Sequence, residues 1–176
     1  IYTEAQMNRE MGVRNAYPHI LQAWDEWARL TGRRYRPVET YRCEDAEYCV
    51  VTMGSYGETA MEVVDAVREE GEEVGVIKIR QWRLFPLDEF RRAALGKKCL
   101  VVVDRAITFG GQGGPVATEL RSALYGREGA PTVVNYVAGL AGRDVSRKDF
   151  RAIILGGKEK AAKGELDGFT LHGLRG

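Results

Sequence analysis

The sequence is poor in the residues that build metal centres and hydrolytic active sites. Its 176 residues include three cysteines, Cys43, Cys49 and Cys99, and two histidines, His19 and His172. No two cysteines form a Cys-x-x-Cys pair, whereas structural zinc and iron–sulfur clusters need about four ligands, usually in close pairs. Two histidines also give no credible Ser-His-Asp or Cys-His arrangement. We therefore expect this chain to carry no metal, no cofactor and no catalytic residue of its own.

Long apolar stretches and an excess of one charge are also missing. No apolar run approaches the roughly 18 residues needed to span a bilayer, and no charged-then-apolar signal peptide is present. The formal net charge is +1, with acids and bases interspersed, so composition favours neither nucleic acid nor membrane as a partner. Cys49 and Cys99 lie in apolar runs, as buried free thiols do, which fits a reducing, cytoplasmic location.

What the sequence does contain is an alternation of short apolar runs and amphipathic segments. The apolar runs predict buried strands at Cys49–Met53, Val74–Ile79, Leu100–Val103 and Thr132–Val137. The more polar segment Val38–Tyr41 predicts an edge strand. Helical spacing of apolar residues follows three of the runs, as in Ala60, Val63, Val64 and Val67. This order predicts the α/β class: a three-layer α/β/α sandwich with a mostly parallel sheet of about five strands.

Changes of pattern divide the chain into three parts. Residues 1–36 form a helical segment, with Pro18 in the first turn of a helix and Gly32 after its end. Residues 37–155 form the α/β domain, whose last helix is predicted to begin with a capping box of Ser146 and Asp149. Residues 156–176 form a carboxyl-terminal tail. The first half of the tail is lysine-rich and predicted to be solvated, and the second half has apolar residues that can dock.

A glycine-rich loop between a predicted strand and a predicted helix is the first candidate site. It contains Gly110, Gly111, Gly113 and Gly114. Its register is neither G-x-G-x-x-G nor a loop followed by G-K-[ST], so both nucleotide-binding fingerprints fail. The glycines have three explanations: close packing against another domain or chain, a local turn, or an anion at the helix amino terminus. We favour the first, because a local turn needs only one or two glycines and each extra one costs backbone entropy.

Two further candidates follow other strands. Gly54 and Ser55 stand where ligands gather in open α/β sheets, although Ser55 with Glu58 also fits a helix capping box, which we favour. Asp104–Arg105 and Arg143–Asp144 follow two later strands. These charges have two interpretations: they position a substrate or phosphate, or they form ion pairs that fix loops. We favour ion pairs, which contribute only about 0–1 kcal/mol when exposed.

Several segments together resemble a known family. Val103–Gly110, which reads VDRAITFG, and the following Gly-Gly-Pro are similar to the LDRNISFG…GGP segment of pyruvate:ferredoxin oxidoreductase alpha chains. Val134–Val145, which reads VNYVAGLAGRDV, is similar to that family's VNFIAGLGGRDV. Tyr41–Glu47, Met53–Ser55 and Arg83–Pro86 match further landmarks in the right order. The resemblance covers roughly residues 2–155. Ala141 replaces a family glycine, and the loop GGQGGP is one residue longer than in close relatives.

The resemblance implies more than the residues alone. Members of this family oxidatively decarboxylate a 2-oxoacid on thiamine diphosphate with Mg, pass electrons through iron–sulfur clusters to ferredoxin, and form an acyl-coenzyme A. It implies that this chain is the transketolase-C-like domain of an alpha chain, with thiamine and clusters held by other domains or subunits. The landmarks lean toward pyruvate as the 2-oxoacid. The alternative from another class is a stand-alone α/β module that binds an anion or nucleotide.

Overall fold

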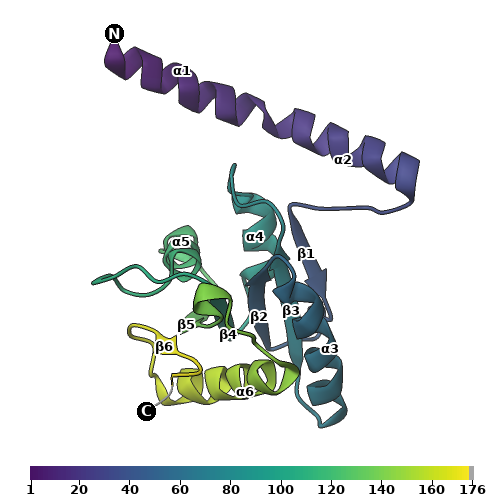
Figure 1. Cartoon of the computed structure of the whole chain (residues 1–176), viewed down its shortest axis with the longest axis vertical. Helices are drawn as coiled ribbons and strands as arrows, with labels where there is room; N and C mark the ends of the chain where they lie inside the picture. The colour runs from purple at the N-terminus through teal and green to yellow at the C-terminus, as the bar shows by residue number, and fades with distance from the viewer. Residues whose placement is uncertain (175–176) are drawn as a thin grey trace.

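The computed structural model describes residues 1–174 and contains one six-stranded sheet (Figure 1). The strands run in the order β1-β3-β2-β4-β5-β6. Five of them are parallel, and only the edge strand β1 pairs antiparallel, with β3. The strands are β1 (Val38–Tyr41), β2 (Tyr48–Met53), β3 (Val74–Ile79), β4 (Cys99–Asp104), β5 (Thr132–Val137) and β6 (Thr170–Leu171). The predicted edge strand and the four predicted buried strands are all confirmed.

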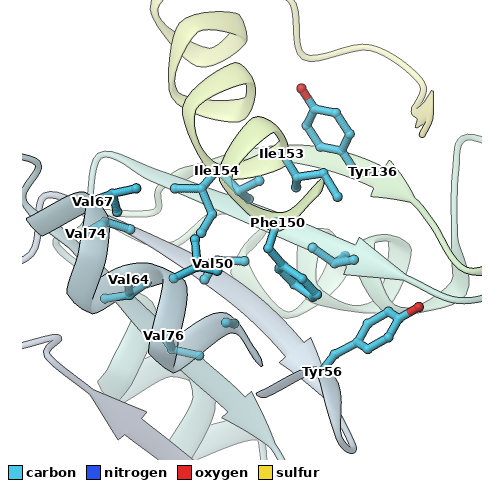
Figure 2. Close-up of a cluster of buried hydrophobic side chains, with 14 of the residues drawn as sticks. Val50, Tyr56, Val64, Val67, Val74, Val76, Tyr136, Phe150, Ile153 and Ile154 are labelled. Carbon is cyan, nitrogen blue, oxygen red and sulfur yellow. The ribbon is translucent and has the colours of Figure 1, made fainter. Parts of the chain in front are cut away.

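Helices cover both faces of the sheet, which confirms the three-layer prediction. On one face lie α3 (Tyr56–Glu69) and α6 (Arg147–Lys163), and on the other α4 (Leu87–Ala94) and α5 (Pro115–Leu124). Side chains along the strands alternate between the two layers. Val50 and Val101 pack with α3 and α6, whereas their neighbours Val51 and Val102 pack with α4 and α5. Figure 2 shows the first of these clusters, closed by Phe150, Ile153 and Ile154.

The amino-terminal segment forms a rod that stands apart from the sheet (Figure 1). It consists of α1 (Tyr2–Asn15) and α2 (Tyr17–Thr31), neither of which contains a buried residue. Gly32 ends α2 in a left-handed conformation, φ +74°, as its position predicts. The hydroxyl of Tyr17 donates to the carboxylate of Glu89 in α4, and this hydrogen bond links the rod to the domain.

The carboxyl-terminal region agrees with the prediction at the start of its helix and differs in the length of that helix and in the number of strands. The capping box of Ser146 and Asp149 is present at the start of α6. That helix does not end near residue 155, however, but continues to Lys163. Gly157 lets this part of the helix lie directly on β4, since an added Cβ would come 2.5 Å from Val101 Cγ1. The residues after α6 return to the sheet as β6 and raise the strand number from about five to six.

No helix in residues 1–174 is both long enough and apolar enough to cross a membrane.

Candidate functional site

The loops that carry the predicted site residues meet at the carboxyl-terminal edge of the parallel strands. Residues Gly54, Asp104 and Gly139 lie at or just beyond the ends of β2, β4 and β5. The chain passes outward from β2 to β3 and then returns across β2 to β4. The change of direction therefore lies between β2 and β4, which is where open α/β sheets form a crevice for ligands.

Asp104 is the buried centre of this edge. It is 1% exposed, and its carboxylate accepts hydrogen bonds from the backbone N–H groups of Val116 and Ala117, at 2.8 and 3.1 Å. Burial raises the pKa of Asp104, and the hydrogen bonds from the start of α5 oppose that rise. Within residues 1–174 Asp104 forms no ion pair, although the sequence favoured loop-fixing ion pairs for the charges at this strand end. Instead Asp104 binds the amino terminus of α5, where an external anion would otherwise bind.

Asn135, in the middle of β5, holds the glycine-rich loop to Asp104. Its amide nitrogen donates to the Asp104 carboxylate at 3.0 Å, and its amide oxygen accepts the N–H of Gly114 at 2.9 Å. Both glycines at this end of the loop are tightly packed. An added Cβ on Gly113, whose φ is +145°, would lie 2.5 Å from Asn135 Oδ1, and one on Gly114 would lie 2.1 Å from Asp104 Cγ. These two glycines have a local reason, contrary to the prediction that all four face a neighbour.

The other half of the loop is exposed. Gly110 has φ +72° and open space where a Cβ would be, and Phe109 beside it is 89% exposed. The N–H of Gly111 donates to the carbonyl of Thr108 at 2.9 Å and closes a tight turn. The loop between β4 and α5 projects away from the layers (Figure 1). We name residues 105–112 the projecting loop.

Ser55 does not cap α3, so the predicted capping box with Glu58 is wrong. Its backbone has helical angles, φ −64° and ψ −21°, whereas a capping side chain needs an extended backbone to reach the helix N–H groups. Glu58 instead pairs with the ammonium of Lys78, a buried lysine of β3. The lysine passes α3 because Gly57 has no side chain; a Cβ there would lie 2.6 Å from Lys78 Cδ. A pocket of about 360 Å³ lies beside this pair, lined by Gly54, Ser55, Glu58, Lys78 and Arg80.

Tyr56 joins the three loops at the direction change. Its ring packs edge-on against Phe150, at 5.3 Å between centroids, and the Arg105 guanidinium lies 4.6 Å above it (Figure 2 shows Tyr56 and Phe150). Its hydroxyl is buried and has no hydrogen-bond partner within the described chain. An added Cβ on Gly139 would lie 1.9 Å from that hydroxyl. Burial raises the pKa of Tyr56, while the charge of Arg105 lowers it.

Arg143 and Asp144 are exposed at the outer side of the edge. Arg143 donates to the backbone carbonyl of Gly173, which ties the turn Leu140–Gly142 to the end of the chain. Asp144 makes no ion pair within residues 1–174. The structure therefore places Arg143 in a loop-fixing contact, with a carbonyl rather than the carboxylate that the sequence suggested.

The donor set at this edge does not fit a metal or an iron–sulfur cluster. Across residues 1–174, no three histidine, cysteine or acidic side chains cluster closely enough to hold an ion. All three cysteines are buried free thiols, as predicted for Cys49 and Cys99. Thiamine diphosphate needs a divalent cation held by oxygen ligands, and these residues do not offer such a set. The edge holds three loops together and presents exposed side chains.

Lys78 and Asn135 organise the edge but were absent from the sequence-based candidates, whereas Tyr56 lies in the candidate segment that starts at Gly54 but was not given a role of its own. Lys78 and Asn135 carried a usable signal. Lys78 and Asn135 are polar residues inside otherwise apolar strand runs, and a buried polar side chain requires a partner. Tyr56 carried none, because an aromatic residue at the start of a helix is ordinary in a core.

Comparison with known proteins gives a family match across the centre of the chain. Residues 46–150 match the model described as pyruvate:ferredoxin oxidoreductase core domain II. The chain is 39% identical over 146 residues to pyruvate synthase subunit PorA of Thermotoga maritima. It is 40% identical over 130 residues to ketoisovalerate oxidoreductase subunit VorA of Pyrococcus furiosus, and 38% over 137 to the NADH-dependent phenylglyoxylate dehydrogenase alpha subunit of Aromatoleum evansii.

These matches cover 83%, 74% and 77% of this chain but only 36%, 33% and 33% of the relatives. The chain thus spans about a third of their length.

Two solved structures share the fold at low sequence identity. One is 2-oxoglutarate:ferredoxin oxidoreductase from Magnetococcus marinus, with TM-score 0.52 and 16% identity over 72% of this chain and 20% of that one. The other is a split-gene transketolase, an inactive tetramer, with TM-score 0.52 and 14% identity over 72% of this chain and 44% of that one. The predicted transketolase-like architecture is therefore confirmed.

Proposed function

Because the chain belongs to the family of the pyruvate:ferredoxin oxidoreductase core domain II, we propose that it is a non-catalytic structural and assembly domain of a 2-oxoacid:ferredoxin oxidoreductase. The single observation that carries the proposal is the match over residues 46–150, which contain β2, β4, β5 and the edge described above. The lack of a ligand set for a metal ion or cluster in residues 1–174 supports a non-catalytic role.

The complete enzyme would oxidise a 2-oxoacid to an acyl-coenzyme A and pass the electrons to ferredoxin. Pyruvate is the first substrate to test, because pyruvate synthase subunits are among the similar relatives. Identity to the ketoisovalerate and phenylglyoxylate enzymes is nearly the same, at 40% and 38%, so side chains outside this domain would set the substrate.

Thiamine diphosphate, Mg and the iron–sulfur clusters would be bound by other domains or subunits. The three buried thiols and the lack of a three-ligand cluster in residues 1–174 support this division. Buried free thiols also support a reducing, cytoplasmic setting. The chain's direct partners would be those other domains or subunits, and coenzyme A and ferredoxin would act at the level of the whole complex.

The projecting loop is the part of the edge that we propose to contact a neighbouring domain or subunit. Phe109 and Gly110 are exposed and support no local packing, unlike Gly113 and Gly114. An exposed aromatic side chain on a protruding loop is typical of an interface anchor. Phe109→Ser should therefore leave the thermal midpoint of the isolated domain unchanged and weaken assembly of the oxidoreductase.

Calorimetry with thiamine diphosphate and magnesium tests the division of labour. The isolated chain should give no heat of binding at micromolar concentrations, and pyruvate should not be decarboxylated. Micromolar binding by the chain alone would contradict the proposal that this domain is non-catalytic. Titration with guanosine or adenosine diphosphate in parallel tests the alternative function, a stand-alone module that binds nucleotides.

A further inference from the structure

Two of the three thiols lie in contact in the layer covered by α4 and α5. The Sγ atoms of Cys43 and Cys49 are 3.5 Å apart, and both residues belong to the same buried cluster. Cys49 sits in β2 and is 0% exposed, whereas Cys43 follows β1 and is 6% exposed. At 3.5 Å the two sulfurs are in direct contact, and they must approach to about 2.05 Å to form a disulfide.

The neighbouring strand provides the space for this contact. Gly75 of β3 pairs with Cys49, and an added Cβ there would lie 2.8 Å from the Cys43 Sγ and 2.7 Å from the Arg42 carbonyl oxygen. Cys43 therefore occupies the position that a side chain at residue 75 would take. The ammonium of Lys97 donates to the backbone carbonyl of Cys43 and holds the loop in place.

The two thiols have different environments. The hydrogen bond from Cys49 lowers the pKa of Cys43, and the charge of Lys97 acts in the same direction, while burial and Glu44 oppose it. The same hydrogen bond, together with burial, raises the pKa of Cys49. Cys43 is thus the thiol that ionises first, and it is also the one with residual exposure.

We propose that Cys43 and Cys49 are an oxidation site, a dithiol that a small peroxide converts to an intrachain disulfide. The Cys43 thiol first loses its proton, and the thiolate attacks one oxygen of hydrogen peroxide; the O–O bond breaks, the departing hydroxide takes up that proton, and Cys43 sulfenic acid and water result. The Cys49 sulfur then attacks the Cys43 sulfur, the S–O bond breaks, and the departing hydroxide takes the Cys49 proton as a second water. Two electrons pass from the sulfurs to the peroxide. A small oxidant is required because only 6% of Cys43 is exposed.

Cys99 is the matched control within the same chain. It is 4% exposed, close to the value for Cys43, but it lies in the cluster on the other face of the sheet, apart from the other two thiols. Burial raises its pKa. A sulfenic acid formed there would have no second thiol to trap it.

The experiment treats the reduced, folded chain with hydrogen peroxide under argon, blocks remaining thiols and maps the cysteines by mass spectrometry after cleavage at glutamate. Glu44 and Glu47 lie between the two cysteines, so their peptides stay together only through a disulfide. We expect a linked pair of peptides, one free thiol at Cys99, and modification of Cys43 roughly tenfold or more faster than of Cys99. Addition of a dithiol reductant should restore all three thiols.

Two results would overturn the proposal. One is oxidation of Cys99 as fast as that of Cys43, and the other is sulfinic acid at Cys43 without any linked peptide. Cys49→Ala should abolish the link and leave Cys43 to oxidise further, whereas Cys99→Ala should not change the link. The map of the unaltered chain decides the question even where a variant does not fold.

Discussion

Residues of the buried edge fix the conformation of the loop between β4 and α5. The carboxylate of Asp104 and the amide of Asn135 bind backbone groups at Gly114, Val116 and Ala117. Each of these polar atoms is buried, so losing a partner would leave an unsatisfied group that costs about 1–3 kcal/mol. The loop is therefore anchored at its carboxyl end, whereas Phe109 and Gly110 at its tip are exposed.

Gly114→Ala should destabilise the domain by about 2–4 kcal/mol, because the new methyl group would overlap the Asp104 side chain. Gly110→Ala is the matched control. It has open space for the methyl group and should lose only about 1 kcal/mol, from the left-handed backbone. Urea unfolding of the two variants measures the difference. Equal losses would mean that the packing around Gly114 is looser than described.

Tyr56→Phe should leave the free energy of unfolding unchanged within about 0.5 kcal/mol, or increase it. The variant keeps the contacts of the ring with Phe150 and Arg105 and removes a buried hydroxyl that has no partner in the described residues. A loss of more than about 1 kcal/mol would show that the hydroxyl has a hydrogen-bond partner after all.

The sequence indicates site residues well where chemistry follows from the local pattern, and poorly where it depends on contacts across the sheet. Asp104 was identified at a strand end, but its partner Asn135 lies 31 positions later, and no local spacing connects them. The contacts of Ser55 also depend on a distant residue. Its spacing with Glu58 fits a capping box, but Glu58 forms an ion pair with Lys78 of the next strand instead.

At the scale of elements, periodicity was sufficient to locate every strand that lies in the centre of the sheet. Helices cover both faces of the sheet, so the side chains on both faces of each central strand are buried. A strand of this kind therefore appears in the sequence as a continuous apolar run. The extent of α6 was not predictable in the same way. Gly156 and Gly157 suggest an end to a helix, but Gly157 is there because α6 approaches β4 closely.

Val102→Asp should prevent folding. Val102 is 0% exposed in the central strand β4 and packs with α4 and α5. An unpaired buried charge costs several kcal/mol against a total stability of about 5–15 kcal/mol. Circular dichroism of the purified variant would show the loss of structure. A folded variant with an unchanged thermal midpoint would contradict the burial of β4.

The amino terminus of α6 should make stability depend on pH. Hydrogen bonds from Ser146 and His172 lower the pKa of Asp149 to about 2, below its ordinary value of about 3.9. The unfolded chain thus binds a proton at Asp149 more readily than the folded one, so its contribution to stability is present above about pH 4 and lost as pH falls toward 2. Thermal midpoints of Asp149→Asn and of the unaltered chain should differ at pH 6 to 7 and converge near pH 2. A constant difference over that range would contradict this assignment.

At the scale of the whole molecule, the sheet domain and the helical rod differ in how they are stabilised. The domain has two complete apolar layers, whereas α1 and α2 bury no residue. Isolated helices of about 15 residues are marginal in water. The rod and the projecting loop are thus the regions where stability would come from a neighbour, which agrees with a domain that functions inside a larger enzyme.

Co-purification tests the central claim most directly, that this chain is an assembly domain of a 2-oxoacid:ferredoxin oxidoreductase. The tagged chain would be isolated without oxygen from cells that produce it, and its partners identified by sequence. The account predicts a stable complex containing a chain with Cys-x-x-Cys cluster motifs and bound thiamine diphosphate, and reduction of a viologen dye that depends on pyruvate or another 2-oxoacid and on coenzyme A. Recovery of the chain alone, folded and without such a partner, would contradict it.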